Sequence, residues 1–240
     1  MCGRFTLTQS PDAIAHSLNL PIPSMFAPRY NIAPTQPVMA VRSSEEKAER
    51  QLTHFTWGLI PSWAKDPKIG AKMINARAET LSEKPSFRAA FKRRRCLVLA
   101  DGFYEWQKLA KGKQPMHFSL QDHQPFGFAG LWEHWQSAEG SEIESCTVIT
   151  TAANDLMRPV HDRMPVILAP QDYDAWLDPQ NSGDRLQSLL RPYAAAEMTA
   201  YPVSTQVNNP RHETPDCIAP LEVNPSDAAH DDPALAQNSR

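Results

Sequence analysis

Twenty-two prolines are spread through this chain of 240 residues, and they constrain its fold more than any other feature. Proline removes a backbone donor and interrupts helix interiors and central strands, so the regular elements have to be short. The sequence also lacks the alternation of strands and helices that builds a parallel sheet. It therefore predicts an α+β fold, a single domain with a curled, barrel-like, mostly antiparallel sheet and short peripheral helices.

Local patterns assign the elements of this fold. Ser10-Pro11-Asp12 is a helix start, Ser86 is expected to cap a second helix, and further helices are expected at 153–158, 171–177 and 183–191. Strands are expected at 37–42, 51–58, 96–100, 103–106, 116–120, 126–132, 146–151, 165–168 and 200–204. We expect one domain over residues 1–222 and a disordered tail over 223–240, which is rich in Asp, Ala, Asn and Pro.

Composition argues against several classes of protein. No run approaches the roughly 18 apolar residues of a membrane helix, and no signal-peptide pattern is visible. The four cysteines show neither CxxC spacing nor a dense framework, which indicates reduced thiols in the cytoplasm. The histidines are scattered, so we predict no metal site and no cofactor, and we expect a monomer.

The charge of the chain is strongly polarised along the sequence. Residues 1–120 contain 18 Lys and Arg against 9 Asp and Glu, whereas residues 121–240 contain 6 against 18. Such a chain can present a basic face although its net charge is −3. The densest basic stretch, 84–95, also fits a solvated helix flank, so it does not decide the function alone.

Cys2 is the most reactive position that the sequence offers. If Met1 is removed, Cys2 carries a thiol and an α-amine, whose ordinary pKa values of about 8.5 and about 8 leave both partly reactive at neutral pH. Such a 1,2-aminothiol condenses with an aldehyde to an imine and then to a thiazolidine. A lone cysteine is more often a small core residue, so the hypothesis needs partners elsewhere in the chain.

Two further positions suit proton transfer. Glu105 lies between aromatic residues on a predicted strand, where desolvation would favour a general acid or base, although an exposed strand glutamate is the simpler interpretation. His161 precedes Asp162 and is either a proton shuttle or a loop histidine held by that carboxylate.

Other positions suit substrate binding. For Asn75 two roles are open: it orients a substrate group, or it forms hydrogen bonds with the backbone of a tight bend. For Arg77 the two possible partners are a phosphate and Glu79. The loop from Trp57 to Trp63 is followed by lysines. This composition is typical of a surface that binds single-stranded nucleic acid, but tryptophans near prolines also pack in the core or at its rim.

Six motifs in the same order together resemble the SOS-response-associated peptidase (SRAP) family, whose members are also called abasic-site processing proteins. The motifs are Met1-Cys2-Gly3-Arg4-Phe5, Arg29-Tyr30-Asn31-Ile32-Ala33-Pro34 (expected to form a defined loop), Trp57-Gly58 to Trp63, Ile74 to Thr80, Ala100 to Trp106, and Val160-His161-Asp162-Arg163-Met164-Pro165.

This resemblance implies a protein that crosslinks itself to abasic sites in single-stranded DNA and shields them during the DNA damage response. Cys2 would form the thiazolidine after loss of Met1, with Asn75, Glu105 and His161 as the other catalytic residues. The DNA contacts would be Arg4, Pro34, Trp63 and Arg77. The family name implies an autopeptidase that removes Met1, and a cytoplasmic, nucleoid-associated protein is expected.

Two alternatives from other classes stay open at this point. Glutamine amidotransferases with an N-terminal nucleophile can also begin Met-Cys-Gly, although no glutamine-binding arginine motif is evident here. A non-catalytic reader of single strands or modified bases would leave Cys2 incidental.

Overall fold

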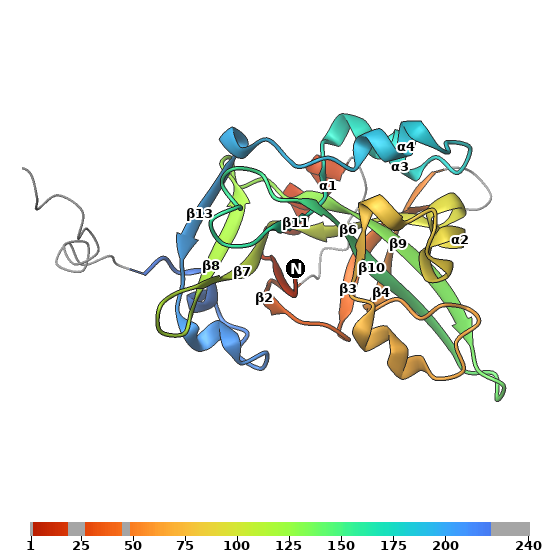
Figure 1. Cartoon of the computed structure of the whole chain (residues 1–240), viewed down its shortest axis with the longest axis horizontal. Coiled ribbons are helices and arrows are strands. Elements are labelled where there is room, and N and C mark those ends of the chain that lie inside the picture. Colours follow the sequence, from red (N-terminus) through yellow and green to blue (C-terminus); the bar gives the residue numbers. More distant parts are fainter. Residues whose placement is uncertain (1, 19–26, 45–48, 222–240) are drawn as a thin grey trace, which may run out of the picture.

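The computed structural model describes residues 2–18, 27–44 and 49–221, which form two adjoining sheets with short helices at the periphery (Figure 1). The first sheet has five antiparallel strands in the order β13-β8-β7-β1-β2. These strands are β1 (Arg4–Leu7), β2 (Arg29–Ile32), β7 (Gly102–Lys108), β8 (Lys113–Leu120) and β13 (Met198–Pro202). The strand β2 therefore lies at an edge, and β1 is held between β2 and β7.

The second sheet closes on itself. Its ring consists of β3 (Pro37–Ser43), β4 (Arg50–Trp57), β10 (Glu142–Ala152), β9 (Phe126–Gln136) and β6 (Arg95–Ala100), each paired with the next. The added strands are β5 (Asn75–Arg77) and β11 (Arg163–Pro165) on β10, and β12 (Ile167–Leu168) on β9. The closed five-stranded barrel beside an antiparallel sheet confirms the predicted α+β fold with a barrel-like sheet.

Within the described residues, four short α-helices lie outside the sheets. They are α1 (Pro11–Leu18), α2 (Pro85–Arg93), α3 (Tyr173–Leu177) and α4 (Asp184–Leu189). Short 3-10 helices occupy Pro67–Lys72, Ala78–Thr80, Pro170–Asp172, Ala195–Glu197, Thr205–Asn208 and Pro215–Ile218. The predicted start of α1 is confirmed, because Ser10 Oγ accepts a hydrogen bond from the Ala13 amide at 3.2 Å. No helix within the described ranges is long and apolar enough to cross a bilayer.

Two predicted helix features are wrong. The segment 153–158 forms turns, because the side chain of Asn154 binds the amide of Met157 at 2.9 Å and Pro159 cannot continue a helix. The helix predicted to begin at Ser86 begins instead at Pro85, with Lys84 as its N-cap residue and no side-chain cap bond. Proline is well suited to the first helical position because its missing donor is not needed there.

One predicted strand and one predicted loop have a different form. The segment 165–168 is divided between β11 and β12, because the chain passes at Val166 from pairing with β10 to pairing with β9. The segment 29–34, expected as a loop, is β2 followed by a turn. The predicted tail at 223–240 and its boundary at residue 222 lie outside the described residues.

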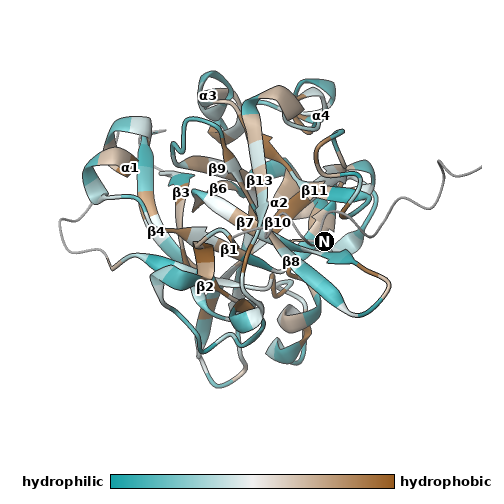
Figure 2. Ribbon diagram, turned by 90° about the vertical axis from the view of Figure 1, so that its left-hand side faces the viewer, coloured by the Kyte–Doolittle hydropathy of each residue, from teal (hydrophilic) through white to brown (hydrophobic). Residues whose placement is uncertain are grey.

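The main core lies where the two sheets meet, and Phe5 of β1 is at its centre. The Phe5 ring contacts Trp57 of β4 edge-on at 4.9 Å and Phe128 of β9 at 5.8 Å. Figure 2 shows apolar stretches on the inner strands and polar segments at the periphery. The strand that follows Cys2 is thus fixed against the barrel by large aromatic side chains.

Candidate active site

Cys2 lies just before β1 and is fully buried, at 0% exposure. Its Sγ lies 3.7 Å from the carbonyl oxygen of Arg4. Burial raises the pKa of the Cys2 thiol far above its usual range, and the negative charge of Glu105 raises it further. The site therefore keeps the sulfur as a neutral thiol.

Asn75 reaches Cys2 from the barrel. It begins β5, which pairs in parallel with β10, and its Nδ2 donates a hydrogen bond to the carbonyl oxygen of Cys2 at 2.7 Å. Its Oδ1 is buried without a hydrogen-bond partner in the part of the chain that the structure describes. The sequence left two roles open for Asn75, binding a substrate group or satisfying the backbone. The observed contact is to the backbone of Cys2, and the side-chain Oδ1 of Asn75 could still accept a hydrogen bond from a substrate.

Glu105 approaches Cys2 from the five-stranded sheet. It lies on β7, whose Tyr104 is paired with Arg4 of β1, and it is 4% exposed. The simpler interpretation of Glu105 as an exposed strand glutamate is therefore wrong. Because Tyr104 lies opposite Arg4, the next residue, Glu105, lies at the start of β1, where the chain arrives from Cys2. Cys2, Asn75 and Glu105 thus meet although their positions in the sequence are far apart.

His161 lies between β10 and β11, with its side chain 31% exposed. Its Nδ1 accepts a hydrogen bond from the Arg163 amide at 3.0 Å and lies 2.9 Å from Oδ1 of Asp162. The proximity of His161 to Asp162, which the alternative of a loop histidine held by that carboxylate requires, is observed.

Arg163 is a residue that sequence reasoning named only as part of a motif. Its guanidinium forms two parallel bonds with the Glu79 carboxylate, at 2.6 and 2.9 Å, and a third with the carbonyl oxygen of Thr150 at 2.6 Å. Glu79 follows β5 and Arg163 begins β11, so the pair ties the segment that carries Asn75 to the segment that carries His161. The ion-pair partner of Glu79 is therefore Arg163, and not Arg77 as one of the two alternatives for Arg77 proposed.

Three of the four predicted DNA contacts lie at the surface. Arg77 and Trp63 are exposed, Trp63 by 59%, and Pro34 is half-buried in the turn after β2. Trp63 is followed by exposed lysines at 65, 68 and 72. An exposed tryptophan among cations is unusual for a core edge and suits a single-strand surface.

Arg4 has a different environment. Its Nη1 donates to Oδ1 of Asn31 and to the carbonyl oxygen of Val207, both at 2.7 Å, and its Nη2 donates to the carbonyl oxygen of Asn208 at 3.2 Å. Arg4 pairs with Tyr104, so its side chain leaves the sheet on the face opposite Glu105. The guanidinium is therefore tied to the C-terminal part of the chain.

The basic stretch 84–95 also divides into two kinds of residue. Arg95 is buried and donates to five backbone carbonyl oxygens, among them those of Trp176 and Asp178 at the end of α3. Arg94 is paired with Glu133 at 2.6 Å. Lys84, Arg88, Lys92 and Arg93 are exposed. Only this last group presents its charge to solvent.

The four cysteines are free and buried, and no group of three or more His, Cys, Asp or Glu within the described ranges is placed to hold a metal ion. The candidate site therefore consists of one thiol, one amide, one carboxyl and one imidazole.

Comparisons with known proteins show which family this chain resembles. A sequence profile of the SOS response associated peptidase (SRAP) family matches residues 1–210. Abasic site processing protein YoqW of Bacillus subtilis is 49% identical over 223 residues, which cover 91% of this chain and 99% of YoqW. Abasic site processing protein HMCES of Xenopus tropicalis is 33% identical over 285 residues, which cover 100% of this chain and 83% of HMCES.

Solved structures show the same fold. A crystal structure of a protein from Bacteroides thetaiotaomicron superposes with a TM-score of 0.81 at 27% identity, covering 92% of this chain and 100% of that one. A second, from Bordetella bronchiseptica, has a TM-score of 0.73 at 28% identity, covering 85% of this chain and 100% of that one.

Proposed function

The chain belongs to the SOS response associated peptidase (SRAP) family, and we propose that it processes abasic sites in single-stranded DNA by forming a covalent bond through Cys2. The observation that carries this proposal is the position of Cys2. A residue next to the chain terminus is fully buried, with its carbonyl oxygen bound by Asn75 and its thiol beside Glu105. Termini are usually left loose, so such an arrangement supports a reactive role.

The first step of the proposed reaction unmasks Cys2. Water hydrolyses the peptide bond between Met1 and Cys2, which releases Met1 and frees the α-amine. The family name supports assigning this cleavage to the protein itself. Only after it does Cys2 carry an amine and a thiol on adjacent carbons.

The second step joins Cys2 to the sugar. His161 moves a proton at the ring oxygen so that the abasic deoxyribose opens to its aldehyde. The α-amine adds to the C1′ carbonyl, and the adduct loses one water to give an imine. The thiol then adds to the imine carbon and its proton passes to the nitrogen, which closes the thiazolidine. One amine, one thiol and one aldehyde thus give one thiazolidine and one water.

The environment of Cys2 supports this order of attack. Because burial and Glu105 disfavour the thiolate, the amine is the first nucleophile and the neutral thiol follows with its own proton. Glu105 serves as the group that takes the proton from the attacking amine and returns it to the departing hydroxyl. Asn75 fixes the carbonyl of Cys2, which keeps both nucleophiles at one distance from the sugar and raises their effective concentration.

The DNA strand is proposed to cross the surface that carries Trp63, Pro34 and Arg77. Trp63 stacks on an exposed base, and Arg77 and the lysines at 65, 68 and 72 meet phosphates. Arg4 is not assigned a direct phosphate contact, because its Nη atoms are bound to internal acceptors.

The test uses purified protein and a single-stranded oligonucleotide with one abasic site. We expect a heat-stable adduct on a denaturing gel, and no adduct with Cys2→Ala. Cys2→Ser keeps the amine and should give an adduct only after borohydride reduction of the imine. Equal binding of abasic DNA by the wild-type protein and Cys2→Ala, with no adduct from either, would support a non-catalytic reader. Release of ammonia from glutamine without an adduct would support an amidotransferase.

A further inference from the structure

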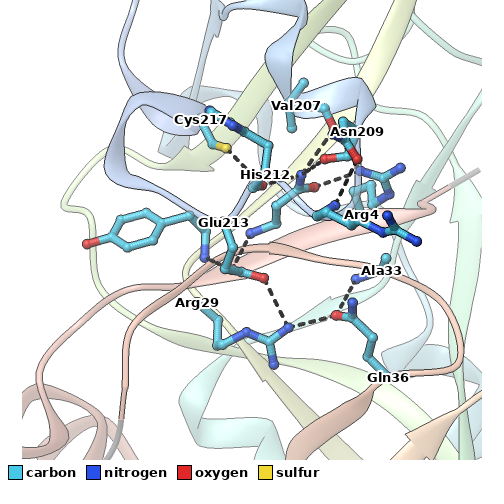
Figure 3. A network of polar contacts seen from close by, with 12 residues as sticks. Arg4, Arg29, Ala33, Gln36, Val207, Asn209, His212, Glu213 and Cys217 are labelled. Atoms are coloured by element: carbon cyan, nitrogen blue, oxygen red, sulfur yellow. Dashed lines mark hydrogen bonds and ion pairs between the residues drawn. The ribbon is translucent and has the colours of Figure 1, made fainter.

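A polar network joins the strand that follows Cys2 to the segment between Ser204 and Ile218, which we name the C-terminal clasp (Figure 3). The clasp contains the last two 3-10 helices and lies on the face of the five-stranded sheet turned away from the barrel. It is closed at its base, because the amide of Leu221 donates to the carbonyl oxygen of Pro202 at 2.9 Å and Val203 forms a bridge to Pro220.

An apolar cluster seats the clasp on the sheet. Tyr104, Val203, Val207 and Cys217 are each fully buried in this small second core. Trp106 packs against the cluster and donates its Nε1 hydrogen to Oδ1 of Asn208 at 2.7 Å. The clasp is thus a fixed part of the fold.

Asn31 on β2 is the centre of the polar network. It is 0% exposed, and its Nδ2 donates to the carbonyl oxygens of Val207, Asn209 and His212 at 3.1, 3.0 and 2.8 Å. Its Oδ1 accepts from Arg4, whose guanidinium also binds the clasp backbone. An apolar residue at position 31 would remove these three hydrogen bonds between β2 and the clasp backbone, and it would also remove the acceptor of Arg4 Nη1.

Glu213 completes the edge of the sheet. Its Oε1 accepts the amides of Tyr30 and Asn31, and its Oε2 pairs with Arg29 at 3.1 Å. The carboxylate thereby accepts hydrogen bonds from two amides of the edge strand β2. The match to the SRAP profile covers residues 1–210, so Glu213 lies just after it.

We propose that the C-terminal clasp, through Asn31, Arg4 and Glu213, is a positioning element that holds β1 from behind so that Cys2 faces Glu105 and Asn75 in one fixed geometry. Only Gly3 separates Cys2 from Arg4, so a displacement of β1 moves the thiol and the amine together. On the barrel side, Asn75 binds the carbonyl oxygen of Cys2. On the opposite side, Asn31 and the clasp bind the side chain of Arg4. As far as it concerns the reaction with DNA, this inference rests on the proposed function.

The test compares Glu213→Ala with Glu213→Gln, which keeps an acceptor for the two amides. Leu186→Ala in α4 is the control, because it destabilises the fold far from β1. All proteins are measured at a temperature at which each is fully folded. The first readout needs no DNA: the rate at which iodoacetamide alkylates each cysteine, located by peptide mass spectrometry.

We expect Glu213→Ala to raise the alkylation rate of Cys2 at least tenfold while the rates of Cys96 and Cys146 in the barrel stay unchanged. Glu213→Gln should stay within threefold of the wild-type protein, and Leu186→Ala should not single out Cys2. An unchanged rate at Cys2 in Glu213→Ala, or an equal rise at the two barrel cysteines, would overturn the proposal.

The second readout is the adduct rate at saturating abasic DNA beside the affinity for an unreactive tetrahydrofuran analogue. Glu213→Ala should lower the rate at least tenfold and change the affinity less than threefold, with Glu213→Gln restoring the rate. A wild-type protein that forms no adduct refutes the proposed function and leaves the alkylation result to decide on the clasp. A wild-type adduct with an unchanged rate in Glu213→Ala refutes the clasp alone.

Discussion

Replacing Gly102 by alanine tests how β7, the strand that carries Glu105, is seated beside β1 and β8. A Cβ on Gly102 would lie 2.3 Å from Nε2 and 2.5 Å from Cε1 of His117, and 2.9 Å from Oγ1 of Thr6. Ordinary contacts of a Cβ atom begin near 3.4 Å, so the imidazole would have to move by about 1 Å. This close approach is the reason for a glycine in the Asp101-Gly102-Phe103 motif.

The imidazole has little room to move. His117 is 4% exposed, and its ring lies between those of Tyr104 and Tyr201, at centroid distances of 5.1 and 5.3 Å. Overfilling a core site of this kind costs about 1–3 kcal/mol. For a chain of this length such a loss lowers Tm by roughly 2–12 °C.

The assay is urea unfolding and calorimetry of Gly102→Ala in two backgrounds, wild type and His117→Ala. Because the clash is with the imidazole, Gly102→Ala should cost markedly less when His117 is absent, with a coupling of about 1 kcal/mol or more. A loss below about 0.5 kcal/mol in the wild-type background, or the same loss in both backgrounds, would refute the argument.

Three further predictions follow from the same structure. Burial lowers the pKa of His117 to about 3, so only the unfolded chain binds a proton between about pH 6.5 and pH 3. The contribution of His117 to the free energy of unfolding should therefore be fully present above pH 6.5 and fall by up to ~5 kcal/mol toward pH 3. In urea unfolding, His117→Gln should weaken this pH dependence. An unchanged pH dependence in His117→Gln would contradict the role given to His117. Trp63→Ala should weaken binding to single-stranded DNA by ~1–3 kcal/mol in fluorescence anisotropy and leave Tm unchanged, whereas equal affinities would remove Trp63 from the DNA surface. Arg163→Gln should slow adduct formation roughly tenfold, and Glu79→Gln should slow it equally without further loss in the double variant, since both break one pair; additive effects would show separate roles.

Much of the fold follows from local sequence signals. The helix after Ser10 and most strands could be predicted because their caps and apolar patterns lie within a few residues of one another. The helix predicted at 153–158 was wrong because the side chain of Asn154 binds the amide of Met157 and, from its Nδ2, the distant carbonyl oxygen of Tyr193 at 2.8 Å. A contact to residue 193 leaves no mark in the local pattern.

The candidate site shows the same division. Cys2 and Glu105 stood out because a thiol at the terminus and a carboxyl among aromatics are unusual residue types for their positions. Glu213 did not, and Asn31 was noted only as part of a motif, because their contact joins residues that are 182 positions apart in the sequence. The pairing of Arg163 with Glu79 was hidden in the same way, since an arginine and a glutamate have many possible partners in any sequence.

The mass of the protein joined to an oligonucleotide with one abasic site tests the central claim most directly. We predict a single product, with the modification at Cys2. Its mass equals the mass of the chain without Met1, plus the mass of the DNA, minus the mass of one water. An adduct on a chain that still begins with Met1, or one attached to a lysine, would contradict it.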